Sequence, residues 1–521
     1  MVMSLQDCIN KISATISKTP QEQRDVVADI KRRGFLKQVT NTILFGLTMS
    51  TCAHKSIADT IIEDLPDLGD TDRSNLSPQQ ADMLGKQVVL NIYAQGGMVE
   101  DFDCLDYLNR LGNEFVSYSP MAGKDFNFYL VKDKDINAFA LPGGYICANN
   151  GLIYTTLSEA ELAGVVSHEV GHVIQHHIFR NISVHNRAQW TGIAGLVTAA
   201  ILAPINPAMA MVVAQGGSAA GTQSMLSFSR DYEREADRVG QNLMYKAGFD
   251  AHAMPEFFQR MQDRYKFNTN DAYAFLQSHP VTLERLSEAE TRANQLPTKM
   301  RADSIDFLLT REKCRIRQIE LKDALKFYNS AIATKRYVSL GSQLYGLALT
   351  HYLQKNYEQS IQTLDKISNP KFLINPIVAG LRAKQMIVIG KNDIADRLYE
   401  QSLARYPTHK GLWMGQLEFL IMIRAYPKAA YRLDELSLAF PMDPDVWDQY
   451  AILYSDAKYN NPIRYHYGLG SEYIVLGHYP HGLEQYRAAL KKKPANKEDD
   501  KIQSIISARI PEIMRAMPSK S

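Results

Sequence analysis

A 34-residue period in the second half of the chain is the feature that most constrains its fold. Pro407 and Pro441 are 34 residues apart, and the same spacing separates Trp413 from Trp447. A period of this length accommodates two helices and their turns, and one such hairpin cannot bury its apolar face alone. The spacing therefore predicts an all-α array of stacked helical hairpins over residues 336–495.

Small and large residues also recur at fixed places inside each period. Small residues let the two helices of a hairpin approach closely, and large ones fill the groove between hairpins. The positions are Ala383, Ala395, Tyr399, Ser402 and Pro407; then Ala429, Leu433 and Pro441; then Leu469, Gly470, Tyr473, Tyr486, Ala489 and Pro494; and, more weakly, Leu344, Ala348, Ser360 and Leu364. This is the tetratricopeptide pattern and predicts a solenoid; the alternative is a generic helical bundle.

The segments around the repeats carry weaker patterns. Residues 301–335 are expected to form a connecting helical segment, and residues 496–521 a polar tail. A helix near Val446–Tyr454 is expected to be an unpaired half-repeat.

Composition excludes several classes of protein. The chain is 45% apolar and 22% charged, which is typical of soluble globular domains and excludes a disordered or polytopic membrane protein. Its 58 basic and 56 acidic residues give a net charge of +2, so we expect no nucleic-acid partner. Five scattered cysteines are too few for a disulfide framework or a cysteine-type zinc site.

The first 58 residues have the pattern of an export signal. Arg32 and Arg33 precede a short apolar stretch, and small residues follow near Ala58. The run from Lys31 to Lys37 resembles the twin-arginine signature, with Lys31 where Ser or Thr is usual. We expect this leader to be cleaved; a Sec signal and an uncleaved anchor are the alternatives.

The strongest chemical signal is His168-Glu169-Val170-Gly171-His172. Ser158 and Glu161 form a capping box that predicts a helix start, and on that helix the two histidines point the same way, one turn apart. Two such imidazoles can bind one Zn²⁺, and Glu169 would stand beside it as a general base. The alternative is a pair of surface histidines.

A catalytic zinc site needs a third protein ligand. The run Ser229–Asp237 predicts a second helix on which Glu233 and Asp237 share a face. Glu233 can bind the metal, while Asp237 accepts the Nδ1–H of a ligand histidine and fixes its tautomer. Glu235 faces elsewhere and is less suited. Taken alone, this stretch would be interpreted as a solvated acidic helix face.

Residues 59–300 mix helical and strand patterns, which predicts an α+β, mainly helical domain. Because this domain carries the H-E-x-x-H motif, we expect it to be a zincin-type metalloprotease domain. The expected strands are Phe126–Val131 and Tyr145–Ala148, with Leu141–Gly144 as the turn between them.

The two metal motifs, some sixty residues apart, resemble the gluzincin peptidase family that includes the CAAX-prenyl endopeptidases and their bacterial relatives. The run Asn137–Gly144 is similar to the family's substrate strand, and His279–Arg285 resembles its later H-P-x-x-x-x-R element. The resemblance covers residues 137–285.

This resemblance implies His168, His172 and Glu233 as ligands of one zinc ion, Glu169 as base and Asp237 as their support. It also implies that His279 can occupy the fourth position as a self-inhibiting switch; from its sequence alone, His279 is only a loop histidine. Spacing cannot assign an oxyanion donor, for which Arg285 and His279 are the candidates. An edge strand formed by Asn137, Ala138, Phe139 and Ala140 could hold an extended peptide by main-chain pairing.

Residues 192–214 form an apolar stretch interrupted by Pro204 and Pro207. The prolines argue against a straight membrane span. We expect a lid over the active site, with peripheral membrane contact as the alternative.

Together with the export signal and the repeats, the resemblance implies a zinc endopeptidase of the periplasm of a Gram-negative bacterium. Its clients would be unfolded or misassembled outer-membrane proteins, and its repeats would bind clients or the assembly machinery. The alternative is a chaperone or scaffold for outer-membrane assembly with little proteolytic activity. A membrane-embedded prenyl-type peptidase is less consistent with the lack of clear spans.

Overall fold

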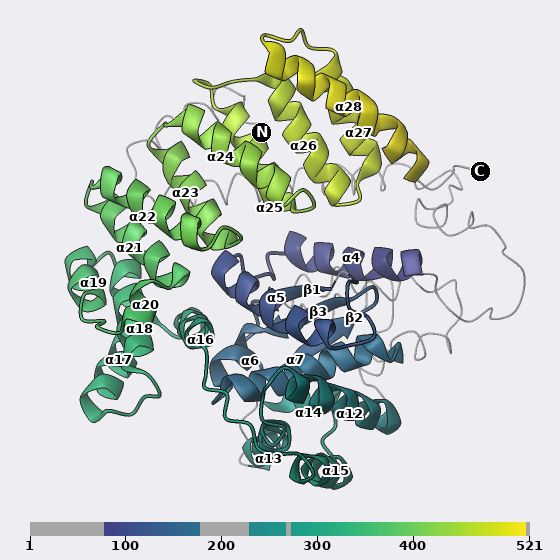
Figure 1. Cartoon of the computed structure of the whole chain (residues 1–521), viewed down its shortest axis with the longest axis vertical. Coiled ribbons are helices and arrows are strands. Elements are labelled where there is room, and N and C mark those ends of the chain that lie inside the picture. The colour runs from purple at the N-terminus through teal and green to yellow at the C-terminus, as the bar shows by residue number, and fades with distance from the viewer. Residues whose placement is uncertain (1–77, 125, 178–228, 267–271, 517–521) are drawn as a thin grey trace, which may run out of the picture. The chain divides into compact units, whose positions relative to one another are not determined.

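The computed structural model describes residues 78–124, 126–177, 229–266 and 272–516. These residues are mainly helical, with one small sheet (Figure 1). The predicted leader, residues 1–58, and the apolar stretch 192–214 lie outside the described residues.

The first group of elements surrounds the sheet. In chain order they are α4 (Pro78–Ala94), α5 (Phe102–Ser117), β1 (Asn127–Val131), β2 (Ala138–Leu141), β3 (Tyr145–Asn149), α6 (Asn150–Thr155), α7 (Glu159–Ile174), α12 (Arg230–Lys246), α13 (Ala253–Lys266), α14 (Tyr273–Ser278) and α15 (Leu283–Asn294).

The sheet has the order β1-β3-β2, with β1 parallel and β2 antiparallel to the central strand β3. The turn Leu141–Gly144 therefore joins β2 to β3, and the prediction that it joins β1 to β3 is wrong. Gly143 has φ +81°, and a Cβ there would lie 2.6 Å from the Cα of Asp82, so the turn needs glycine for both conformation and space. β2 is left at one edge of the sheet.

Alternate residues of each strand face opposite layers, as the two-residue period of a strand requires. Phe128, Leu130 and Ile146 pack into the large core that contains α5 and α7. Val131 and Tyr145 pack with α4 on the other face. In Figure 1, α4 and α7 accordingly lie on opposite sides of the sheet.

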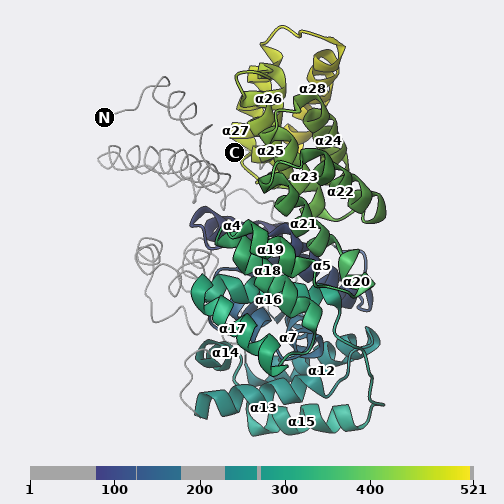
Figure 2. The ribbon, with the colours of Figure 1, turned by 90° about the vertical axis from the view of Figure 1, so that its left-hand side faces the viewer.

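The rest of the chain is helical. Its elements are α16 (Ile305–Gln318), α17 (Leu321–Thr334), α18 (Leu340–Leu353), α19 (Tyr357–Leu364), α20 (Pro370–Leu373), α21 (Pro376–Val388), α22 (Asn392–Arg405), α23 (Lys410–Met422), α24 (Tyr426–Ala439), α25 (Pro444–Ser455), α26 (Pro462–Val475), α27 (Tyr479–Leu490) and α28 (Lys497–Ala516). Figure 2 shows α16 to α19 stacked side by side, and α18 contacts both α17 and α19.

Two predictions for this region are wrong. The helix near Val446–Tyr454 is not unpaired, because α25 packs so closely on α26 that a Cβ at Gly468 would lie 2.9 Å from the amide nitrogen of Ala451. The segment expected as a polar tail forms α28 over most of its length. Ile502, Ile506 and Ile513 are buried there, since their helical spacing gives this charged segment one apolar stripe against α26 and α27.

α16 is attached to α5 by a partly buried group of four charges, which we call the α5–α16 charge cluster: Asp101, Asp103, Lys313 and Arg317. The Nζ of Lys313 lies 2.7 Å from the Oδ1 of Asp101 and also binds Asp103. Arg317 pairs with the other oxygen of Asp101. Asp101 also caps α5 by accepting the amide N–H of Cys104.

Among the described residues, no helix combines the length and apolar character that crossing a membrane would require.

Candidate metal centre

Helix α7 carries both histidines of the H-E-x-x-H motif. Its first turn is capped as predicted: Ser158 accepts the amide N–H of Glu161, and the Glu161 carboxylate accepts the amide N–H of Leu157. Leu162, Val165 and Val166 anchor the helix in the core, so both His168 and His172 are fully buried.

Helix α12 crosses α7 at two glycines. A Cβ on Gly240 would lie 2.7 Å from the amide nitrogen of His168, and one on Gly171 would lie 2.9 Å from the carbonyl oxygen of Ala236. Only glycine permits this approach, which brings Glu233 and Asp237 of α12 against the histidines. Both carboxylates are at most 1% exposed.

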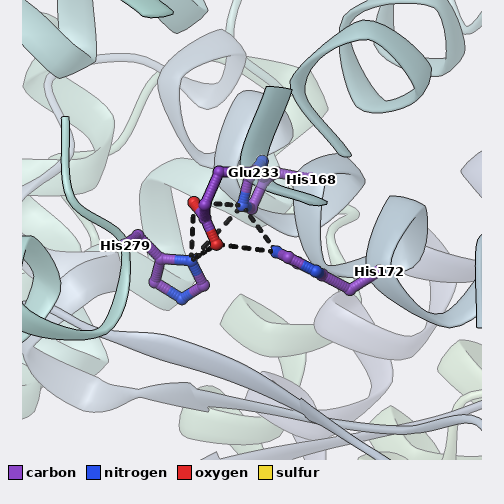
Figure 3. Close-up of side chains that lie close together, drawn as sticks. All are labelled: His168, His172, Glu233 and His279. Atoms are coloured by element: carbon purple, nitrogen blue, oxygen red, sulfur yellow. Dashed lines mark hydrogen bonds and ion pairs between the residues drawn. The ribbon is translucent and has the colours of Figure 1, made fainter. Parts of the chain in front are cut away.

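Four side chains converge here: His168, His172, Glu233 and His279 (Figure 3). The Nε2 atoms of His168 and His172 are 3.0 Å apart, and Glu233 oxygens lie 3.5 and 3.3 Å from them. The Nδ1 of His279 is 3.3 Å from the Nε2 of His168 and 3.2 Å from the Oε1 of Glu233.

These separations fit a tetrahedral zinc ion. Bonds of 2.0–2.1 Å at tetrahedral angles place neighbouring ligand atoms about 3.3 Å apart. Burial lowers the pKa of His172 to about 3, which leaves its imidazole neutral, as a metal ligand must be. Burial also lowers the pKa of His168, but Asp237 and Glu233 outweigh it and raise that pKa to about 10. The carboxylates therefore favour positive charge between the ligand atoms.

Asp237, the residue expected to support a ligand histidine, contacts His168. Its Oδ1 lies 2.9 Å from the Nδ1 of His168, which directs the other ring nitrogen into the site. Burial alone would raise the pKa of Asp237, but the charge of Arg285 outweighs it and lowers the pKa to about 2.

Arg285, the candidate transition-state stabiliser, lies behind the ligands. Its Nε and Nη2 donate to Asp237 at 2.7 and 2.8 Å, and its Nη1 lies 2.7 Å from Glu233 and 2.8 Å from the carbonyl oxygen of Pro280. The side chain is 1% exposed. This placement favours a role in holding the two carboxylates over one in contacting substrate.

His279 follows the end of α14 and occupies the side of the site next to the sheet edge. Its Nδ1 points at the ligand atoms, and its Nε2 lies 3.2 Å from the carbonyl oxygen of Ala138 in β2 and 3.4 Å from Glu169. Burial lowers the pKa of His279, but the charges of Glu233 and Glu169 outweigh burial and raise it.

Glu169 is fully buried beside the ligand group. Burial raises the pKa of Glu169 above its ordinary value, against the opposing charge of His279. A raised pKa makes this carboxylate a stronger proton acceptor, which suits a general base.

The candidate substrate strand lies next to this site. Ala138, Phe139 and Ala140 fall in the edge strand β2, and Asn137 directly precedes it. Asn137 accepts a hydrogen bond from Ser278, so β2 and the His279 loop are joined at their ends.

The sequence did not predict a role for His177, which is fully buried with its Nδ1 3.0 Å from the Nδ1 of His172. It also did not predict the contact between Glu235 and His177. The only signal in the sequence was a further histidine five residues after His172, which a regular helix would have turned away from it.

Comparison with known proteins agrees with this geometry. Residues 106–293 match the model of peptidase family M48, a stretch that includes every residue of the site. The Yersinia pestis "Beta-barrel assembly-enhancing protease" is 29% identical over 399 residues, 74% of this chain and 79% of that protein. A Vibrio cholerae protein provisionally given the same name is 30% identical over 330 residues, 63% of this chain and 68% of that protein. The "Mitochondrial metalloendopeptidase OMA1" of Arabidopsis thaliana is 30% identical over 169 residues, 32% of this chain and 31% of that protein.

Proposed function

The chain belongs to peptidase family M48 and is a metalloprotease, and on that premise we propose that it is a periplasmic zinc endopeptidase whose clients are unfolded or misassembled outer-membrane proteins. The observation that carries the proposal is the convergence of His168, His172 and Glu233 at the separations of a tetrahedral zinc site, with Glu169 buried beside them.

We assign His168, His172 and Glu233 as the ligands of a single zinc ion. Bound there, the ion would supply Lewis acidity that activates water and polarises the scissile carbonyl. Glu169 acts as general base and then delivers the proton to the leaving amine. Asp237 and Arg285 hold the ligand set and do not contact the substrate.

The edge strand β2 supports a preference for extended, unfolded chains. Main-chain pairing with Asn137–Ala140 tolerates any client sequence and would place a peptide beside Glu169. His279 lies between β2 and the ligand atoms, so the same residue that contacts Ala138 also fills the fourth direction of the site. We propose that His279 keeps the enzyme inhibited until it is displaced.

We also propose roles for the other segments of the chain. Residues 1–58 are proposed as a cleaved twin-arginine leader, residues 59–300 as the protease domain, residues 301–335 as the connecting segment, and residues 336–495 as a tetratricopeptide solenoid that binds clients or assembly machinery. The helix pairs α21–α22 and α23–α24, which follow the 34-residue period, support the solenoid. Residues 192–214 are proposed as a lid.

Cleavage of an unfolded protein such as casein tests the enzymatic part. We expect Glu169→Gln to lower the cleavage rate by about 10²–10⁴-fold while zinc stays bound, because the ligands remain and the base is lost. His279→Ala should cleave faster than the wild type. Glu290→Gln, at an exposed position of the same domain, is the matched control and should behave like the wild type.

A zinc-loaded wild type that cleaves nothing, together with an inactive His279→Ala, would contradict the endopeptidase assignment of this chain. The scaffold function would then be favoured.

A further inference from the structure

The chain turns back on itself directly after α7. The helix ends at Ile174, and His176 adopts the left-handed conformation with φ 55°. On a continuing helix, a residue five positions after His172 would point away from it. The reversal at His176 instead places His177 beneath His172, with the two Nδ1 atoms 3.0 Å apart.

Hydrogen-bond geometry assigns the ring protons of both histidines. The Nε2 of His172 points at the ligand atoms, so its ring proton lies on Nδ1 and is donated to the Nδ1 of His177. The proton of His177 must then lie on Nε2, which is 3.1 Å from the Oε2 of Glu235. The carboxylate completes a line of two hydrogen bonds that ends at a proposed metal ligand.

Helix α12 holds His177 on two sides. Tyr232 stacks on its imidazole with ring centroids 4.6 Å apart and an interplanar angle of 10°, while Glu235 binds its edge. Tyr232 directly precedes the proposed ligand Glu233, and Glu235 lies two residues after it. Residue 177 is thus fully buried and restrained in both position and ring orientation.

We propose that His177, held by Glu235 and Tyr232, is a positioning residue that orients His172 and strengthens it as a metal ligand. Asp237 accepts the ring proton of His168 directly, whereas Glu235 acts on His172 through the imidazole of His177. This inference rests on the proposed zinc site, since it concerns how tightly that site holds its ion.

Zinc affinity, measured by competition with a chromogenic chelator on the full-length protein, tests the inference independently of proteolysis. His177→Phe keeps a flat ring for Tyr232 but removes the acceptor of the His172 proton. We expect its zinc dissociation constant to rise by about 10- to 100-fold, the usual effect of losing such a partner. His177→Asn restores an acceptor close to the position of Nδ1 and should recover most of the affinity.

Glu235→Gln guards against a folding defect, because it changes a partly exposed side chain and keeps its shape; it should weaken zinc binding less than His177→Phe. His176→Asn is the matched control, since Asn tolerates the left-handed conformation and the side chain is exposed. Wild-type affinity in both His177→Phe and Glu235→Gln would overturn the inference and leave the zinc site standing. A wild type that binds no zinc would instead contradict the proposed function.

Discussion

The metal centre and the α5–α16 charge cluster both hold several charged side chains that are buried or partly buried, but only the α5–α16 charge cluster balances negative with positive groups of its own. In the α5–α16 charge cluster, Asp101 and Asp103 meet Lys313 and Arg317, so two negative groups face two positive ones. In the metal centre, Glu169, Glu233 and Asp237 are opposed by the single guanidinium of Arg285. The buried carboxylates there outnumber the guanidinium group by two.

This difference shows that the α5–α16 charge cluster uses its charges for structure, whereas the metal centre uses them for function. Burying a charge is tolerated only when it is paired or coordinates a metal. The α5–α16 charge cluster satisfies that condition with its own side chains and serves to join two helices. In the metal centre, the carboxylates outnumber the guanidinium group by the charge of one divalent cation, and His168 and His172 direct their ring nitrogens to the same point.

The largest expected effect comes from removing the metal. A chelator should destabilise the protease domain, because the carboxylates lose their counter-charge and must bind protons. If free zinc exceeds its dissociation constant 1,000-fold, the loss is about 4 kcal/mol. Calorimetry with and without chelator measures it, and Lys313→Met should show the same shift as the wild type. An unfolding temperature that does not respond to chelator would mean that the site needs no cation.

The next effect comes from breaking the α5–α16 charge cluster. Lys313→Met leaves Asp101 and Asp103 partly buried without their main partner, and we expect a loss of about 3 kcal/mol in the free energy of unfolding. Zinc affinity should not change. Denaturant unfolding measures the loss.

Lys326→Met is the matched control for this variant. Lys326 is 77% exposed in its ion pair with Asp323, so the change should stay within about 0.5 kcal/mol. Equal effects of the two substitutions would show that the buried cluster contributes nothing particular to stability.

The same comparison explains which features could be predicted from the sequence. His168, Glu169 and His172 lie on one helix, as do Glu233 and Asp237, and helix periodicity alone determines which of them share a face. That these two helices meet depends on glycine contacts between them; the pairing was predicted from the need for a third zinc ligand, and the resemblance to the gluzincin family then supported it.

Features that depend on chain reversals could not be predicted. His177 reaches His172 only because of the conformation of His176, and Arg285 reaches Asp237 only because of the loop before α15. α28 is a different case, because the spacing of Ile502, Ile506 and Ile513 was visible but outweighed by the charged residues around it.

The smallest expected effect is a pH dependence that belongs to the α5–α16 charge cluster alone. Burial raises the pKa of Asp101, but the charges of Lys313 and Arg317 outweigh it and hold that pKa well below its ordinary value. The stability that Asp101 contributes is therefore fully present above the unfolded-state pKa of about 3.9, and it is lost as pH falls toward the folded-state pKa.

Asp101→Asn should remove this pH-dependent contribution to stability. The difference in unfolding free energy between the wild type and the variant should be constant near neutral pH. Below about pH 4 it should shrink by up to about 1.4 kcal/mol per pH unit. Acid also releases metal, but that loss is common to both proteins and cancels in the difference. Asp323→Asn, at the exposed pair, should show a small and constant offset. A difference for Asp101→Asn that stays constant down to pH 2 would show that Asp101 is not held ionised by the cluster, and the contrast with the metal centre would lose its basis.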